Sequence, residues 1–133
     1  MPTPRPGGPV RGSSTGRPIM AAMDLFGRRW ALRILWELRA GPIGARALLA
    51  QCEGLSSSVL YQRLRELTSS GIITPSADGY ELTPTGADLG RALAPLDQWA
   101  NTWAQKQKQE HDQDHDHDHD ERVDHTGRPP ERD

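Results

Sequence analysis

The chain has 133 residues, a formal net charge of −2 and 35% hydrophobic residues, which suits one modest domain with tails. A single cysteine excludes an intramolecular disulfide, and no run approaches the ~20 apolar residues that a membrane-spanning helix requires. The N-terminus lacks the apolar segment of a signal peptide. We therefore expect a cytoplasmic protein with no membrane partner.

Composition divides the chain into three regions. Residues 1–18 are rich in Pro, Gly and Ser and hold three arginines and no acid, hence a charge of +3. Residues 106–133 hold five basic residues against ten acidic ones, hence −5. Neither tail has enough apolar surface to offset the entropy lost on ordering, so we predict a disordered basic arm and a disordered acidic tail. Residues 19–105 hold eight basic and eight acidic residues and would form the folded domain.

Apolar spacing predicts three helices in the first half of this domain. The first would span 19–26 and the second 29–39, where apolar residues recur at threes and fours. Gly41 and Pro42 would end the second helix, because this pair breaks helical structure. A third, short helix would cover 44–52.

A capped amphipathic helix is predicted at 56–70. Ser56 can accept a hydrogen bond from an N–H of the first turn, and leucines spaced by four and three would face the core. The opposite face carries hydroxyl, amide and guanidinium groups, which read base edges and bind phosphates. A solvated outer face of a core helix is the alternative interpretation. The polar residues are Ser57, Ser58, Tyr61, Gln62 and Arg65.

A hairpin and a long helix would follow. A short strand begins near Ile72, and Asp78-Gly79 is a strong signal for a two-residue hairpin turn. The last helix is predicted at about 86–108, with Pro95 inside it causing a kink or a break. Its apolar stripe holds two tryptophans, more apolar surface than so small a domain needs. We therefore predict self-association through this stripe, with packing on its own core as the alternative.

The predicted element order is that of a winged helix-turn-helix. The chain further resembles the HxlR-type family of bacterial transcriptional regulators over roughly residues 17–104. The resemblance is carried by MDLFGRRWALRILWEL (23–38), the pattern S-x-x-x-L-x-x-R-L-x-x-L (56–67), G-I-I (71–73) and Y-x-L-T-x-x-G (80–86). The expected fold class is α+β and mostly helical, a winged helix-turn-helix with a short two-stranded wing and a C-terminal dimerisation helix.

The resemblance implies a homodimer that binds an inverted-repeat operator in double-stranded DNA, with the 56–70 helix in the major groove. The first and last helices would form the dimer interface. The expected DNA contacts are Ser56, Ser57, Ser58, Tyr61, Gln62, Arg63, Arg65, Arg28 and Arg29, with a structural role as the alternative for Arg63. The expected dimer contacts are Met20, Met23, Leu89, Leu93, Leu96, Trp99 and Trp103.

Three features depart from the family pattern. The Cys-Pro pair with which many members sense oxidants or electrophiles is Arg17-Pro18 here, and Cys52 is interpreted as a small buried core residue, not as a reactive thiol. The wing is short, with Asp78 at its tip and no Lys or Arg, so we expect weak or absent minor-groove contact. Ser58 stands where the family often has Arg or Lys. The arginines of the N-terminal arm could replace some of these contacts.

The C-terminal tail repeats His and Asp. His115, His117 and His119 could chelate a divalent transition metal, although a solvated acidic tail is the simpler interpretation, and no metal site or cofactor is predicted. All five histidines lie in this tail and the chain has no Gly-rich phosphate loop, so an enzyme is not expected. Two alternatives to a DNA-binding regulator stay open: a winged-helix protein-interaction module that does not bind DNA, and a metal-responsive regulator acting through the tail. The sequence indicates no effector.

Overall fold

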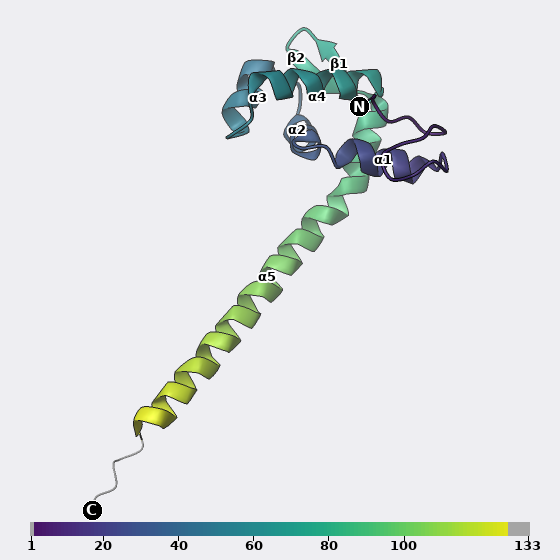
Figure 1. The fold of residues 1–133 in the computed structure, drawn as a ribbon. Helices are drawn as coiled ribbons and strands as arrows, with labels where there is room; N and C mark the ends of the chain where they lie inside the picture. The colour runs from purple at the N-terminus through teal and green to yellow at the C-terminus, as the bar shows by residue number, and fades with distance from the viewer. Residues whose placement is uncertain (1, 128–133) are drawn as a thin grey trace, which may run out of the picture. The chain divides into compact units, whose positions relative to one another are not determined.

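The computed structural model describes the backbone of residues 2–127 and the side chains of residues 2–114. The chain divides into two compact units, Met1–Ala92 and Leu93–Asp133. Within the described residues lie five helices and one antiparallel two-stranded sheet (Figure 1). In chain order these are α1 (Pro18–Phe26), α2 (Ala31–Leu38), α3 (Ala45–Gln51), α4 (Ser57–Ser69), β1 (Ile73–Ser76), β2 (Gly79–Leu82) and α5 (Pro84–Gly127).

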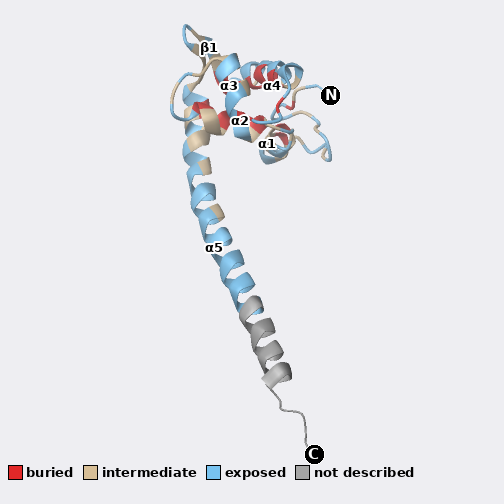
Figure 2. Ribbon diagram, turned by 90° about the vertical axis from the view of Figure 1, so that its left-hand side faces the viewer, coloured by how far each residue is buried: buried red, intermediate tan, exposed pale blue. Residues whose placement is uncertain are grey.

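The hydrophobic core of the first unit lies among the first four helices and β1 (Figure 2). The leucines of α4 are completely or almost completely buried in it, at spacings of four and three, which confirms the predicted apolar stripe. Burying a leucine side chain contributes roughly 1.5–3 kcal/mol, so these side chains fix one face of α4 against the core. They are Leu60, Leu64 and Leu67.

The turn between α1 and α2 begins with a glycine and ends with a tryptophan in a left-handed conformation. α1 starts at Pro18, whose fixed φ suits a first helical position, and ends at Phe26, which Gly27 follows. α2 begins at Ala31, two residues later than predicted, because Trp30 adopts a left-handed conformation with φ +76°. Among the described residues Trp30 is the one non-glycine with positive φ. The prediction that residue 29 begins the second helix was therefore wrong.

α4 has a side-chain cap at its start and a glycine stop at its end. The hydroxyl of Ser56 accepts a hydrogen bond from the N–H of Val59 at 3.3 Å, which confirms the predicted cap. At the other end Gly71 has φ +76°, and the N–H of Ile72 donates to the carbonyl of Leu67 at 3.0 Å. This arrangement satisfies carbonyl groups that would otherwise lack partners at the end of α4.

The hairpin turn lies one residue earlier than predicted. Ser76 pairs with Gly79, so the two connecting residues are Ala77 and Asp78 rather than Asp78 and Gly79. Gly79 has φ +127°, and a Cβ atom there would lie 2.4 Å from the carbonyl oxygen of Ile43. Glycine is thus required where β2 passes close to the backbone that precedes α3.

A backbone bridge to the segment before α3 extends the sheet. The N–H of Ile43 donates to the carbonyl of Tyr80 at 3.0 Å, and the N–H of Tyr80 donates in return at 2.9 Å. This bridge was not predicted from the sequence. It attaches the hairpin to the start of the helix-turn-helix unit, which consists of α3 and α4.

α5 starts at Pro84 and is much longer than predicted. The hydroxyl of Thr83 accepts a hydrogen bond from the N–H of Gly86 at 3.1 Å and donates to the carbonyl of Gly71 at 2.6 Å. The helix continues to Gly127, not to about 108, with Pro95 inside it. No Pro or Gly occurs between these two residues, and Gln, Lys and Glu there are good helix formers. The predicted division into residues 1–18, 19–105 and 106–133 stays a prediction.

Residues 2–17 precede α1 and form turns. The N–H and carbonyl of Val10 bond with those of Ser13, and the N–H of Gly7 donates to the carbonyl of Gly16 at 2.9 Å. The N–H of Arg11 donates to Asp24 of α1 at 3.1 Å.

In the part of the chain that the structure describes, no helix is both long and apolar enough to cross a membrane.

Candidate nucleic-acid interface

α4 presents a polar face to solvent and an apolar face to the core. Helix geometry places residues three and four apart side by side, so the polar side chains that face away from the leucines are neighbours. Tyr61 is 46% exposed although it carries a large ring. The exposed residues on this face are Ser57, Ser58, Tyr61, Gln62 and Arg65.

Hydroxyl groups gather at the N-terminal end of α4. The hydroxyl of Ser56 accepts from the N–H of Val59 and also lies 3.3 Å from the hydroxyl of Ser58. The first N–H groups of a helix carry partial positive charge and commonly bind phosphate. This end of α4 therefore combines a phosphate-attracting terminus with hydroxyls that can hydrogen-bond bases or backbone.

Glu66 of α4 is buried, with 7% of its surface exposed, and accepts hydrogen bonds from two arginines. Its Oε1 accepts from Arg63 Nη1 at 2.9 Å, and its Oε2 pairs with Arg28 Nη1. Arg63 Nε also donates to the carbonyl of Arg29 at 2.7 Å, and Arg28 Nη2 donates to the carbonyl of Pro2 at 2.8 Å. This network joins α4 to the turn between α1 and α2.

The two paired arginines keep little surface for DNA. The side chains of Arg28 and Arg63 are 10% and 15% exposed. Their ion pairs with Glu66 favour a structural role for both arginines, which for Arg63 is the alternative given in the sequence analysis. DNA contact by either arginine stays a prediction. The side chains of Arg29 and Arg65, by contrast, are exposed.

The wing is short and carries no basic side chain. Each strand has four residues, and the exposed tip consists of Ala77 and Asp78. No Lys or Arg occurs between Arg65 and Arg91. The wing therefore contributes no positive charge to this surface.

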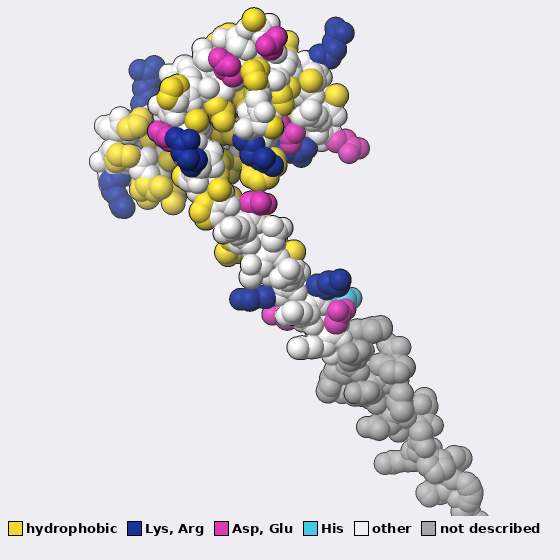
Figure 3. Space-filling view, turned by 180° about the vertical axis from the view of Figure 1, so that it is seen from behind, with side chains coloured by type: hydrophobic (Ala, Val, Ile, Leu, Met, Phe, Trp, Pro, Cys, Tyr) yellow, Lys and Arg dark blue, Asp and Glu magenta, His cyan; other side chains and the backbone are white. Residues whose placement is uncertain are grey.

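In the second unit, α5 carries an exposed apolar stripe. Trp99 and Trp103 are 57% and 52% exposed, and their rings stack with centroids 5.4 Å apart. Leu96, one turn earlier, is half exposed. Figure 3 shows hydrophobic side chains on the early turns of this helix and charged ones further along.

The other predicted dimer contacts differ in exposure. Met23 is exposed and Met20 is half-buried on α1. Leu89 packs against the core of its own unit, whereas Leu93 is half-buried. A role of any of these residues in a dimer stays a prediction.

Comparison with known proteins agrees with this architecture. The model of the HxlR-like helix-turn-helix family matches residues 25–108, more than half of the chain. The chain belongs to the HxlR-like helix-turn-helix family. It is therefore a transcriptional regulator of helix-turn-helix type, and the winged-helix fold class expected from the sequence is confirmed.

Relatives of this HxlR-like regulator are themselves described as regulators. It is 32% identical to the HTH-type transcriptional regulator YvaP of Bacillus subtilis over 89 residues, which are 62% of this chain and 82% of YvaP. It is 34% identical to the HTH-type transcriptional regulator Rv3095 of Mycobacterium tuberculosis over 99 residues, 69% of this chain and 60% of that protein.

Solved structures show the same fold. The quinone-bound YodB of B. subtilis is 27% identical, with a TM-score of 0.59 over 63% of this chain and 96% of that one. A regulator from Enterococcus faecalis described as of the MarR family is 28% identical, with a TM-score of 0.62 over 74% of this chain and 96% of that one.

Cys52 of the HxlR-like regulator lies inside the core. It is completely buried, in agreement with its interpretation as a core residue. Burial raises the pKa of its thiol, and the nearby Arg33 only partly opposes this effect. The thiol therefore stays neutral near pH 7 and is a poor nucleophile.

The predicted metal ligands of the tail fall outside the described side chains. His115, His117 and His119 lie beyond residue 114, so their metal binding stays a prediction. Within the residues whose side chains are described, no group of three His, Cys, Asp or Glu residues is arranged to hold a metal ion.

Sequence reasoning missed the role of Glu66. Helix periodicity does not place Glu66 on the leucine face, because successive residues of a helix are about 100° apart. The local signal that could have revealed its role is Arg63, three residues earlier and therefore its neighbour on the same helix. The second partner, Arg28, is 38 residues away and has no local signal.

Proposed function

We propose that this HxlR-like regulator binds double-stranded operator DNA as a homodimer, with α4 in the major groove. The observation that carries the proposal is the exposed polar face of α4, whose opposite face is packed against the core. The buried leucines and the ion pair between Glu66 and Arg28 hold that helix against the rest of the unit. A rigid helix of this kind can present the same donors and acceptors to each half-site.

Roles divide along α4. Ser57, Ser58, Tyr61 and Gln62 lie toward its N-terminal half, where recognition helices meet base edges, and would read sequence. Arg65 and the exposed Arg29 would bind backbone phosphates.

The homodimer is supported by the apolar stripe of α5. Large exposed aromatic side chains are enriched at interfaces, and the two stacked tryptophans together with Leu96 form such a surface. A two-fold dimer would place two copies of α4 on one duplex, which requires an inverted repeat.

The division of roles is testable by fluorescence anisotropy with the DNA upstream of the regulator's own gene and with random duplex. Gln62→Ala should weaken upstream binding by about 1–3 kcal/mol and leave random binding unchanged. Arg65→Ala should weaken both and reduce the salt slope by about one. Arg91→Ala, which removes an exposed arginine outside α4, is the matched control and should have little effect. Equal losses for Gln62→Ala on both duplexes would contradict base reading.

A protein-interaction module without DNA binding is the second candidate. The acidic tip and the absence of basic residues in the wing favour it. It predicts no binding to any duplex at low ionic strength in the same experiment.

A further inference from the structure

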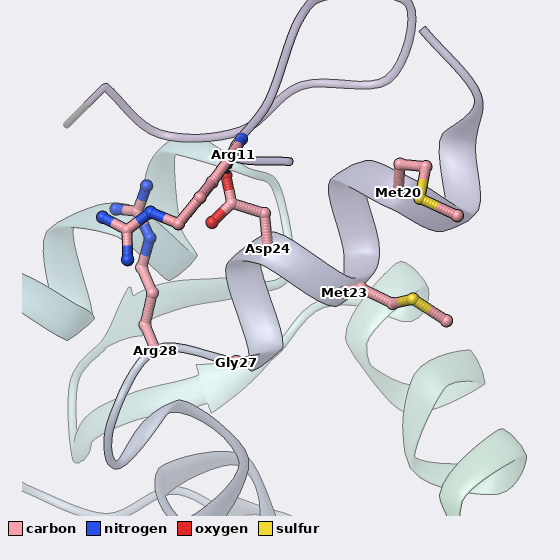
Figure 4. Close-up of a pocket in the computed structure, with 6 residues that line it drawn as sticks. All are labelled: Arg11, Met20, Met23, Asp24, Gly27 and Arg28. Atoms are coloured by element: carbon pink, nitrogen blue, oxygen red, sulfur yellow. Dashed lines mark hydrogen bonds between the residues drawn. The ribbon is translucent and has the colours of Figure 1, made fainter. Parts of the chain in front are cut away.

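Two adjoining cavities lie beside the turn between α1 and α2 in the first unit. Each has a volume of about 290 Å³. Small-molecule sites usually span ~300–1,000 Å³, so each cavity is at the lower limit and the pair lies within the range. Both are lined by Arg11, Gly27 and Arg28; the first adds Met20, Met23 and Asp24 (Figure 4), and the second adds Arg29, Gln62, Arg63 and Glu66.

The second cavity has a strong excess of positive charge. Four arginines line it and one carboxylate, Glu66, faces them, which gives a formal charge of +3. The carboxylate of Glu66 is paired with Arg28 and Arg63. The side chains of Arg11 and Arg29 are exposed to solvent. Guanidinium groups brought together in this way attract a carboxylate or phosphate, which they can bind through two parallel hydrogen bonds.

The first cavity supplies an apolar surface next to these charges. In Figure 4 Met20 and Met23 project from α1 on one side of Asp24, and the side chains of Arg11 and Arg28 lie on its other side. Methionine side chains are flexible and polarizable, so they adapt to rings of irregular shape. Asp24 is already bonded to the N–H of Arg11, at 3.1 Å.

We propose that the pair of cavities is an effector site for a small aromatic anion. The carboxylate or phosphate of the ligand would lie among Arg11, Arg28 and Arg29, and its ring would lie against Met20 and Met23. The binding itself is independent of the proposed function; only its regulatory consequence rests on DNA binding by α4.

Arg28 connects this site to α4. Its guanidinium pairs with Glu66 and donates to the carbonyl of Pro2, so a ligand anion competes with both partners. Ligand binding therefore weakens the ion pair that joins α4 to the α1–α2 turn. The expected consequence is greater mobility of α4.

The test is calorimetry of the full chain with 1-naphthoate, without DNA and at constant ionic strength. We expect one ligand per chain, with affinity at least tenfold above that for inorganic phosphate and for the neutral 1-naphthalenemethanol. Arg11→Gln and Arg29→Gln should each lower naphthoate affinity at least fivefold, and both residues are exposed, so the fold should persist. Arg46→Gln, an exposed arginine of α3 outside both cavities, is the matched control and should change nothing.

Several results would overturn the site. Inorganic phosphate binding as tightly as naphthoate would mean that the arginines bind a plain phosphate, such as one of the DNA backbone. Unchanged naphthoate binding by both arginine variants would place the ligand elsewhere, and no binding at all would refute the site. A protein that binds naphthoate but no duplex would keep this site and refute the proposed function.

The link to α4 has its own readout. Amide hydrogen exchange of residues 57–69 should accelerate when naphthoate is added to the wild-type protein, because the Arg28–Glu66 pair weakens. Arg11→Gln, which removes part of the site, should reduce this acceleration. Exchange in α4 that is unaffected by bound naphthoate would contradict the link.

Discussion

Glu66 joins α4 to the turn between α1 and α2 through its ion pair with Arg28. Its carboxylate is buried between two guanidinium groups that are themselves mostly buried. A buried ion pair contributes little net stability compared with a well-packed apolar cluster. Removing one partner, however, leaves a buried charge uncompensated and is costly.

Glu66→Gln is therefore expected to destabilise the protein by about 3 kcal/mol, because an amide cannot neutralise Arg28 and Arg63. Urea unfolding followed by circular dichroism measures this change. Glu53→Gln, at an exposed position, is the control and should stay within about 0.5 kcal/mol of the wild type. If the two variants unfolded at the same urea concentration, the network would not be a structural element.

Among the elements, the hairpin depends on one glycine. Gly79→Ala should destabilise the protein by about 1–3 kcal/mol, since it strains a positive φ and drives Cβ into the backbone of Ile43. Gly90 lies within α5, and a Cβ atom there would meet open space. Gly90→Ala should therefore leave the stability of the protein unchanged or raise it by up to about 1 kcal/mol. Thermal melting of both variants decides this, and an equal effect of the two would contradict the close approach of β2 to Ile43.

Elements whose signals are local could be predicted from the sequence. The leucine spacing and the Ser56 cap predicted α4, and the same periodicity predicted which of its side chains are exposed. The errors arose where periodicity carries no signal: Trp30 adopts a left-handed conformation and delays α2, and Gly79, close to the backbone of Ile43, belongs to β2 and not to the turn. The ion pair between Glu66 and Arg28 joins residues 38 positions apart, so helix periodicity could not predict it.

For the whole molecule, the proposal requires two chains. Replacing Trp99 and Trp103 together by alanine should raise the dimer dissociation constant roughly 800-fold, since two interface hot spots at about 2 kcal/mol each contribute about 4 kcal/mol. Sedimentation equilibrium over a concentration series measures this constant. Gln107→Ala, an exposed polar position on the same helix, is the control. A wild-type protein that sediments as a monomer throughout would refute the dimer.

The central claim is that two copies of α4 read one duplex. Selection of bound sequences from a random duplex library with the wild-type protein tests it most directly. The account predicts enrichment of an inverted repeat whose half-sites are centred about 10 base pairs or a multiple of that distance apart, with altered base preference in Gln62→Ala. Enrichment of a single asymmetric site, or of no sequence at all, would contradict it.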